Sequence, residues 1–240
     1  MLRVLFLHGL ESRPNGGKVL ALRAQGFEVI APDMQMGTSQ IRRKNSVIRM
    51  LMRLGEVRLF ALVVITWVAL SLSLRHPWWS LGGLALLVIG WRARYPHWVA
   101  SALARSFETC VQIACDSVHD AEAAVLVGSS WGGAVAAELL TRGVWRGPTI
   151  LLAPAIAAVY RKTQRADAAA HLSRLRELSA TVPILIFHDP ADETIPHADS
   201  ESLAAGSSIE LRSVSAGGHR LMQLLERGTL AAAIHSLTRL

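Results

Sequence analysis

Cysteine is scarce in this chain of 240 residues, which contains only Cys110 and Cys115. The two lie in a stretch with helical spacing, and their separation matches neither Cys-x-x-Cys nor any metal-ligand pattern. These features exclude a disulfide-stapled domain and a cysteine-bound zinc cluster, and they favour a reduced, cytosolic environment. Residues 1–10 are too short for a signal-peptide core followed by a cleavage site, so we expect a strand there.

Charged residues are also few, at 18% of the chain, against roughly 25% in typical soluble domains. The chain has 25 basic and 18 acidic residues, so its formal net charge is +7. No zinc-finger spacing or RNA-binding signature accompanies this charge, and we therefore expect no nucleic-acid partner. A mean hydropathy of +0.33 indicates apolar surface beyond that of a soluble core.

Strand and helix patterns alternate outside the middle of the chain, which is typical of an α/β fold with a mainly parallel sheet. The expected strands are Val4–His8, Phe27–Ala31, Ala123–Val127, Thr149–Ala153, Pro183–Phe187 and Ile209–Val214. The expected helices are Lys18–Gln25, Trp131–Arg142 and Arg220–Leu237. We interpret residues 1–240 as a single domain with one insertion.

The insertion, about residues 45–105, contains two uncharged runs, Leu59–Leu74 and Pro77–Trp91, separated by Arg75 and His76. As helices they would each span about 23–24 Å, which is short of the ~30 Å hydrocarbon core of a bilayer. We expect a helical hairpin that crosses a thin bilayer or enters one leaflet. The alternative is a hydrophobic cap packed on a soluble body.

Charge placement predicts the orientation of this hairpin. Basic residues flank both runs, whereas Arg75 is the basic residue of the turn, beside His76. The flanking residues are Arg42, Arg43, Lys44, Arg49, Arg53, Arg58, Arg92, Arg94 and Arg105. By the positive-inside rule, the body lies at the cytoplasmic face of the cell membrane, with Trp78, Trp79 and Trp91 near the interface. A free cytoplasmic protein is the alternative.

Residues 128–132 spell Gly-x-Ser-x-Gly around Ser130, between a strand-like run and a helix-like run. A nucleophile at the tip of a sharp strand-to-helix turn needs small neighbours two residues away on each side. Gly128 and Gly132 meet this need for Ser130. Val127 and Trp131 would flank Ser129 and are too large. The pattern predicts Ser130 as a nucleophile and the N–H of Trp131 as an oxyanion donor; a plain Gly-Ser turn is the alternative.

A serine hydroxyl needs a base to take its proton and a carboxylate to orient that base. On a strand-turn-helix scaffold of this kind, the partners follow in the order serine, acid, histidine. Asp192 and His219 follow the last two expected strands. They are the candidate carboxylate and base.

Four motifs together resemble the serine hydrolases of the α/β-hydrolase superfamily: residues 6–9 (FLHG), residues 128–133 (GSSWGG), Asp192–Pro196 and Gly218-His219. Within that superfamily the chain is similar to YqiA-like esterases and ABHD10-like acyl-protein thioesterases. The resemblance covers about residues 1–40 and 107–240, not the insertion.

The resemblance implies the roles of the site residues. Ser130 would be the nucleophile, His219 the general base and acid, and Asp192 the orienting carboxylate. The amides of Leu10 and Trp131 would form the oxyanion hole, and no cofactor or metal would be required.

One departure from the family pattern leaves a rival for the acid. In the family, the strand that leads to the acid is followed by His-Gly. In this chain the corresponding residues are His188-Asp189. Asp189 is thus a rival to Asp192, and Glu193 is a weaker one. His8 is interpreted as shaping its loop, and His188 as structural or exposed to solvent.

The expected activity is hydrolysis of a small or lipid-like carboxylic ester at the cytoplasmic face of the membrane, which the hairpin would contact. A thioester, either an S-acylated protein or acyl-CoA, is the close alternative. A catalytically silent, membrane-anchored scaffold is the alternative from another class. Arg161, Lys162 and Arg165 either attract anionic substrates or form a solvated basic face, and the second interpretation is favoured.

Overall fold

The computed structural model describes residues 1–10, 12–36, 44–74 and 77–239. Of the basic residues discussed above, Arg42, Arg43 and Arg75 lie outside the described residues, as does His76. The side chains of Trp78 and Trp79 also lie outside the description, so their expected place at an interface is not addressed.

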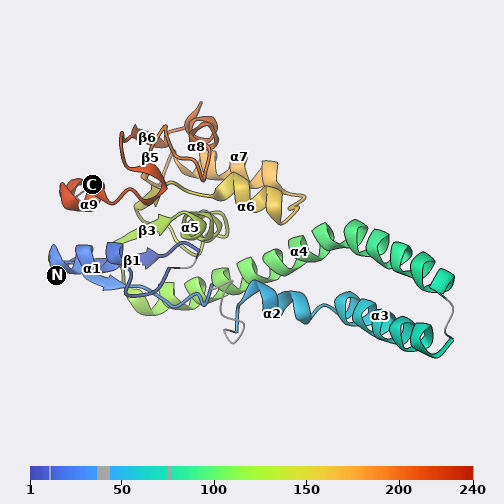
Figure 1. The fold of residues 1–240 in the computed structure, drawn as a ribbon. Coiled ribbons are helices and arrows are strands. Elements are labelled where there is room, and N and C mark those ends of the chain that lie inside the picture. The colour runs from blue at the N-terminus through green and yellow to red at the C-terminus, as the bar shows by residue number, and fades with distance from the viewer. Residues whose placement is uncertain (11, 37–43, 75–76, 240) are drawn as a thin grey trace.

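The body of the molecule is built on a six-stranded sheet in the order β2-β1-β3-β4-β5-β6 (Figure 1). Each pair of neighbouring strands is parallel. The strands are β1 (Arg3–Leu7), β2 (Glu28–Ile30), β3 (Val125–Ser129), β4 (Thr149–Leu152), β5 (Ile184–His188) and β6 (Glu210–Ser213). The predicted α/β class with a mainly parallel sheet is therefore confirmed.

Helices cover both faces of this sheet, because successive side chains of a strand point to opposite faces. Leu5 and Leu126 belong to one buried cluster, and Val4 and Val125 to the other. The first face packs against α4 (Pro77–Ala121), α5 (Trp131–Thr141), α6 (Ile156–Lys162), α7 (Ala168–Leu178) and α8 (His197–Ala204). The second packs against α1 (Gly17–Ala24), α9 (Gln223–Glu226) and α10 (Thr229–Leu237).

The single closing helix expected over 220–237 is wrong. A 3₁₀ turn, Gly218–Arg220, precedes α9, and α10 follows Gly228. Gly228 has a φ of 67°, a left-handed conformation that ends one helix before the next begins.

A helical arm extends from the body and consists of α3 (Gly55–Leu74) and the first part of α4, with the short α2 (Val47–Met52) at its root (Figure 1). The expected second helix over 77–91 is too short. It is the beginning of α4, which has 45 residues and would be about 68 Å long. The helix continues because its later residues, including Trp98 and Ala102, bury one face. Pro96 lies inside it, and a proline there removes a helical hydrogen bond and bends the axis.

The two arm helices contact each other through small residues. A Cβ on Gly83 would collide with the indole of Trp67, and one on Gly90 would lie 3.8 Å from the Phe60 ring. The glycines thus allow close approach of the helices. At the root, the indole N–H of Trp98 donates to the Glu56 carboxylate at 2.9 Å.

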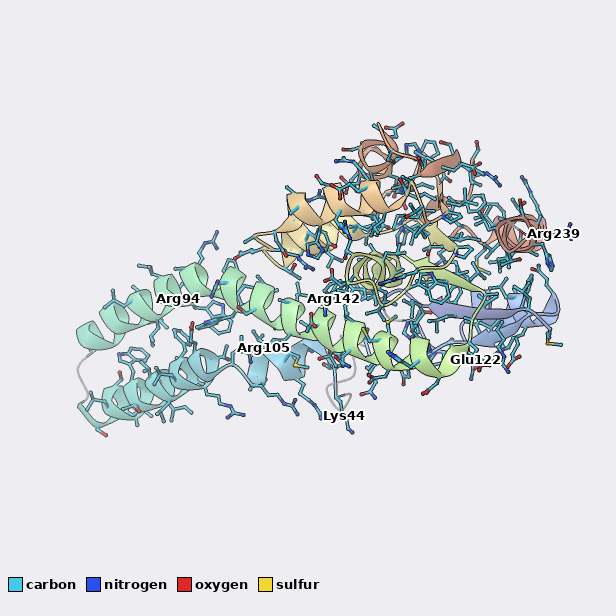
Figure 2. The ribbon with its side chains drawn as sticks, turned by 180° about the vertical axis from the view of Figure 1, so that it is seen from behind. Lys44, Arg94, Arg105, Glu122, Arg142 and Arg239 are labelled. Carbon is cyan, nitrogen blue, oxygen red and sulfur yellow. The ribbon has the colours of Figure 1, made fainter. Side chains whose placement is uncertain are left out.

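The outer faces of the arm are apolar and uncovered. The stretch Gly55–Ser73 is long and apolar enough to cross a membrane, with a mean hydropathy of 1.8 and only 6% of its window buried. The exposed apolar side chains, 42–77% accessible, are Leu59, Leu62, Val63, Ile65, Val68, Leu70, Leu72, Leu84, Leu86, Val88 and Ile89. This exposure argues against a cap packed on the body. Lys44, Arg94 and Arg105 lie along the arm and its root (Figure 2).

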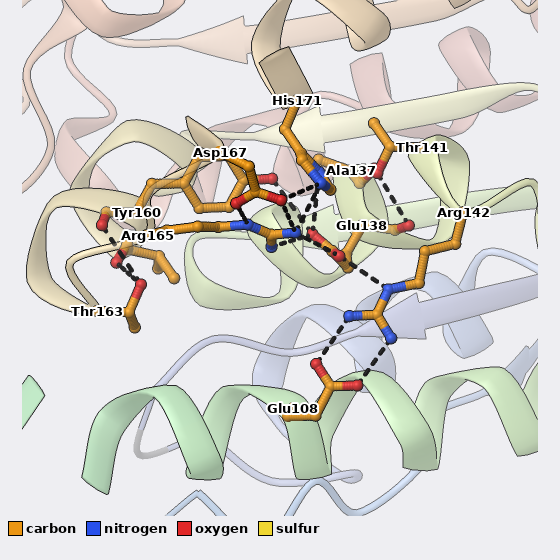
Figure 3. A network of polar contacts seen from close by, with 11 residues as sticks. Glu108, Ala137, Glu138, Thr141, Arg142, Tyr160, Thr163, Arg165, Asp167 and His171 are labelled. Carbon is orange, nitrogen blue, oxygen red and sulfur yellow. Dashed lines mark hydrogen bonds and ion pairs between the residues drawn. The ribbon is translucent and has the colours of Figure 1, made fainter. Parts of the chain in front are cut away.

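An ionic network centred on the buried Glu138 joins the arm-bearing helix to the body (Figure 3). Glu138 of α5 is fully buried and pairs with Arg142 at 2.8 Å and Arg165 at 2.6 Å. Arg142 also makes two 2.7 Å hydrogen bonds to Glu108 of α4. A buried carboxylate requires such partners, so the network fixes α4 against α5. The interpretation of Arg165 as part of a solvated face is therefore wrong.

Candidate active site

Ser130 occupies the tip of a sharp turn between β3 and α5, with a φ of 53° that is unusual for a residue with a Cβ. Its N–H donates to the carbonyl of Leu152 at 2.9 Å. Its own carbonyl accepts from the amides of Gly133 at 2.9 Å and Ala155 at 3.0 Å. Hydrogen bonds from neighbouring elements thus hold the strained residue in place.

The two glycines of the motif are needed for this turn. A Cβ on Gly128 would lie 2.6 Å from the carbonyl oxygen of Gly132. A Cβ on Gly132 would collide with the carbonyl of Leu7 in β1. The spacing argument that selected Ser130 over Ser129 therefore has a direct steric basis.

His219 lies in the loop after β6 and connects the other two predicted residues. Its Nε2 is 2.9 Å from the Ser130 Oγ, and its Nδ1 is 2.8 Å from the Asp192 Oδ2. With the proton on Nδ1 donated to Asp192, Nε2 is free to accept the hydroxyl proton of Ser130. The structure thus brings the predicted serine, histidine and aspartate into one hydrogen-bonded chain.

Asp192 is buried and its carboxylate is fixed from several directions. Its Oδ1 accepts the N–H groups of Thr194 at 2.7 Å and Ile195 at 3.0 Å. Burial alone raises the pKa of Asp192, but the hydrogen bonds from His219, Ile195 and Thr194 outweigh it and hold that pKa below its ordinary value. The carboxylate is therefore ionised at neutral pH and able to orient His219.

Asp189, the rival carboxylate, lies beneath the loop that carries His219. Its Oδ2 accepts the N–H groups of Gly217 and Gly218, each at 2.6 Å, and its Oδ1 accepts that of Ala191 at 2.8 Å. The hydrogen bond from Ala191, aided by those from the two glycines, lowers the pKa of Asp189. Asp189 thus positions the His219 loop, and the weaker rival Glu193 is exposed.

Leu10 and Trp131, the predicted oxyanion residues, line the same cavity of about 1030 Å³ as Ser130 and His219. Trp131 is the first residue of α5, so its N–H has no acceptor within the helix. In the part of the chain that the structure describes, no acceptor is found for the amide of Leu10 or Trp131. Gly9 packs against Ser130, because a Cβ there would lie 3.2 Å from the serine Cβ.

These candidate site residues all follow the carboxyl ends of parallel strands, where ligands of open α/β sheets bind. Leu10 follows β1, Ser130 follows β3, Asp192 follows β5 and His219 follows β6. β2 and β3 pair with opposite edges of β1, which makes this the point where the strand order reverses.

No protein-family model and no curated protein matches this sequence. Solved structures do resemble it. A protein from Thermus thermophilus is 20% identical with a TM-score of 0.55, over 98% of this chain and 89% of the other. A protein from Xanthomonas campestris pv. campestris, described as a hydrolase of the alpha/beta superfamily, is 22% identical with a TM-score of 0.53, over 99% and 100%. The chain has the α/β-hydrolase fold.

A third structure of this fold is that of Est1E from Butyrivibrio proteoclasticus with bound ferulic acid. It is 12% identical with a TM-score of 0.52, over 98% of this chain and 87% of the other. The narrower likeness to YqiA-like esterases and ABHD10-like thioesterases stays a prediction.

For two residues near the site, Lys18 and His188, the sequence predicted no specific role. Lys18 follows the first residue of α1, and its ammonium donates to the Ser129 hydroxyl at 2.9 Å. His188, expected to be structural or exposed, is buried between Ser200 at 2.7 Å and the Ile195 carbonyl at 3.1 Å. Burial lowers the pKa of His188, and its Nε2 also lies 3.2 Å from Asp192. His188 directly follows an expected strand, which is a weak signal for a role near the site, whereas Lys18 lies in an expected helix and nothing in the local sequence indicates its contact with Ser129.

Replacing Asp189 by Asn should destabilise the loop that carries His219. Because the pKa of Asp189 is depressed in the folded state, its carboxylate stabilises the fold above its ordinary pKa, near 4. We expect Asp189→Asn to lose about 1–3 kcal/mol at pH 7, and to approach wild type as the pH falls below 4. Urea unfolding at pH 7 and pH 3 measures both effects.

The control for this measurement is Asp116→Asn, which changes a carboxylate bonded to the exposed amide of Gln112. It should unfold like wild type at both pH values. An Asp189→Asn protein as stable as wild type at pH 7 would contradict the role given to Asp189.

Proposed function

We propose that the chain is a serine hydrolase that cleaves a carboxylic ester through an acyl-enzyme on Ser130. The observation that carries this proposal is the pair of contacts at His219, 2.9 Å to Ser130 and 2.8 Å to Asp192. Ser130 and His219 line one cavity at the carboxyl edge of the sheet, with Asp192 buried behind His219. Nucleophile, base and orienting acid in hydrogen-bond reach are the arrangement that acyl transfer requires.

The proposed reaction follows from this geometry. The Nε2 of His219 takes the proton of Ser130 while the Oγ attacks the ester carbonyl carbon. The amides of Leu10 and Trp131 donate to the oxyanion that forms. His219 then protonates the leaving alcohol, and the same nitrogen activates the water that releases the acid. Asp192 stays ionised throughout and stabilises the charged imidazole.

The cavity favours an ester with an apolar acyl part. Apart from its polar residues, it is lined by Leu10, Leu103, Val159 and Met222, among others. Burial of methylene groups contributes about 0.8 kcal/mol each. An acyl chain along these side chains would thus bind by apolar contact while its carbonyl lies against Ser130.

We also propose that the arm inserts into the cell membrane, with the body on the cytoplasmic side. Support comes from α3, whose 20 residues would span about 30 Å, the thickness of the hydrocarbon core. At the base of the arm, Trp91 stacks on Tyr95 and meets Trp98 edge to face, and interfacial aromatics are favoured at such a position. The basic residues on both flanks favour the cytoplasmic side.

Such an orientation would bring the cavity near the lipid surface. Leu103 of α4 lines the cavity, and it follows Tyr95 by two turns, about 12 Å along the helix. Lipophilic acyl chains leaving the bilayer would have a short path to Ser130. This is the physical reason to join the two proposals.

Labelling with a fluorophosphonate probe tests the nucleophile. We expect wild type to be labelled once, at Ser130, because the probe phosphonylates a serine that a base activates. Ser130→Ala should not be labelled. Ser129→Ala, a matched change one residue away, should still carry the label at Ser130. Equal labelling of Ser130→Ala and wild type, or no labelling of wild type, would contradict the proposal that Ser130 is the nucleophile.

Vesicle flotation tests the membrane proposal. Wild type should float with the vesicles and resist extraction by salt, since its exposed apolar side chains gain by leaving water. A variant with Leu62→Gln, Ile65→Gln, Leu86→Gln and Ile89→Gln should stay in the dense fraction. The control Leu20→Gln changes a comparably exposed leucine on α1 and should float. Release of wild type by salt alone would exclude insertion.

A further inference from the structure

The charged side chains of the cavity wall are all cationic. They are Lys18, Arg161, Lys162 and Arg220, and the described wall contains no aspartate or glutamate. Arg161 is neutralised by Asp199, 3.1 Å away. Among the residues that the structure describes, Lys18, Lys162 and Arg220 have no carboxylate partner within ion-pair distance. The cavity therefore holds positive charge that the protein itself does not neutralise.

Lys18 is the member of this set that contacts Ser129, the residue before Ser130 in the chain. It is partly buried, and its ammonium donates to the hydroxyl of Ser129, the neighbour of Ser130. An ammonium has three N–H donors, and the described residues accept one of them. Two donors beside the nucleophile are left for a molecule in the cavity.

The environment of Lys18 disfavours an unaccompanied charge. Burial, together with repulsion from Arg220, lowers the pKa of Lys18 to about 8. Most of the lysine is nevertheless charged at neutral pH, so the cation is held partly desolvated beside a second cation. An anion placed between them would gain charge-assisted hydrogen bonds and relieve that repulsion.

We propose that Lys18 and Arg220 form an anion subsite beside Ser130, and that the esters cleaved here carry a phosphate or carboxylate group bound by this subsite. The inference rests on the proposed hydrolase function and adds the class of its substrate. The anion has two possible sources, the phosphate of a lipid headgroup or the acidic group of a water-soluble ester. Lys162 lines the same cavity. The proposal therefore assigns to Lys162 the attraction of anionic substrates, in place of the solvated basic face favoured from the sequence.

A matched pair of soluble esters tests the subsite. The 4-nitrophenyl monoester of adipic acid and 4-nitrophenyl hexanoate share leaving group and chain length, and differ in the terminal carboxylate. We expect wild type to have the higher kcat/KM for the acidic ester. Lys18→Met should reduce that preference about 10- to 100-fold, the effect of a hydrogen bond to a charged group. Lys18→Arg keeps the charge and should retain most of the preference.

A second pair identifies the source of the anion. Lysophosphatidic acid and the monoacylglycerol with the same acyl chain, both in detergent micelles, differ only in the phosphate. A preference for the phosphate in this pair assigns the subsite to a lipid headgroup. A preference confined to the soluble pair assigns it to a free acid.

Two further variants are measured, one as a second test of the subsite and one as a control. Arg220→Gln removes the second cation from an exposed side chain and tests the subsite even where Lys18→Met fails to fold; it should also reduce the preference. Arg174→Gln removes an exposed charge of α7 that pairs with Glu177 at 3.4 Å, outside the cavity wall. It should leave the ratio of the two kcat/KM values unchanged.

Equal kcat/KM values of wild type for the acidic and neutral members of both pairs would overturn the subsite. Equal losses of kcat/KM for the acidic and the neutral ester in Lys18→Met would also overturn it, because Lys18 would then act only by supporting Ser129. These outcomes leave the hydrolase proposal intact. Failure of wild type to cleave any of the four esters, with no labelling by the fluorophosphonate, would instead contradict the proposed function itself.

Discussion

The site depends on one steric constraint, the left-handed turn at Ser130. With a φ of 53°, the residue is strained, and the turn closes only because Gly128 and Gly132 have no Cβ. Hydrogen bonds to Leu152 and Ala155 tie the strained backbone to the neighbouring elements. Among the described residues, the first amide of α5 also has no acceptor, so the same constraint that presents the hydroxyl presents an N–H group beside it that a developing oxyanion could use.

The long helix α4 joins two different environments in one element. Its later part is buried against β1 and α5 and is fixed by the Glu108–Arg142–Glu138 network. Its first part exposes apolar side chains and packs on α3 through Gly83 and neighbouring positions. Because Leu103 lies between these parts and lines the cavity beside Ser130, the arm and one wall of the cavity belong to the same helix.

Much of the site was predictable because its constraints are local. Glycine spacing selects Ser130, and residue order after the strands selects Asp192 and His219, which the structure brings into contact. What was missed depends on contacts between distant segments. The helix α4 extends to Ala121 because its later residues have a buried face, which the uncharged first part of the helix lacks. The role of Asp189 depends on the amides of Gly217 and Gly218, which lie beyond β6. Lys18 meets Ser129 across more than a hundred residues, so no local pattern indicates their contact.

Trapping of the covalent intermediate tests the central claim most directly. Wild type is mixed with 4-nitrophenyl hexanoate, quenched in acid during turnover and measured by intact-protein and peptide mass spectrometry. The mechanism predicts a mass increase of one hexanoyl group, located on Ser130, and its disappearance once the ester is consumed. Turnover without any adduct, or an adduct on a residue other than Ser130, would contradict an acyl-enzyme at this turn.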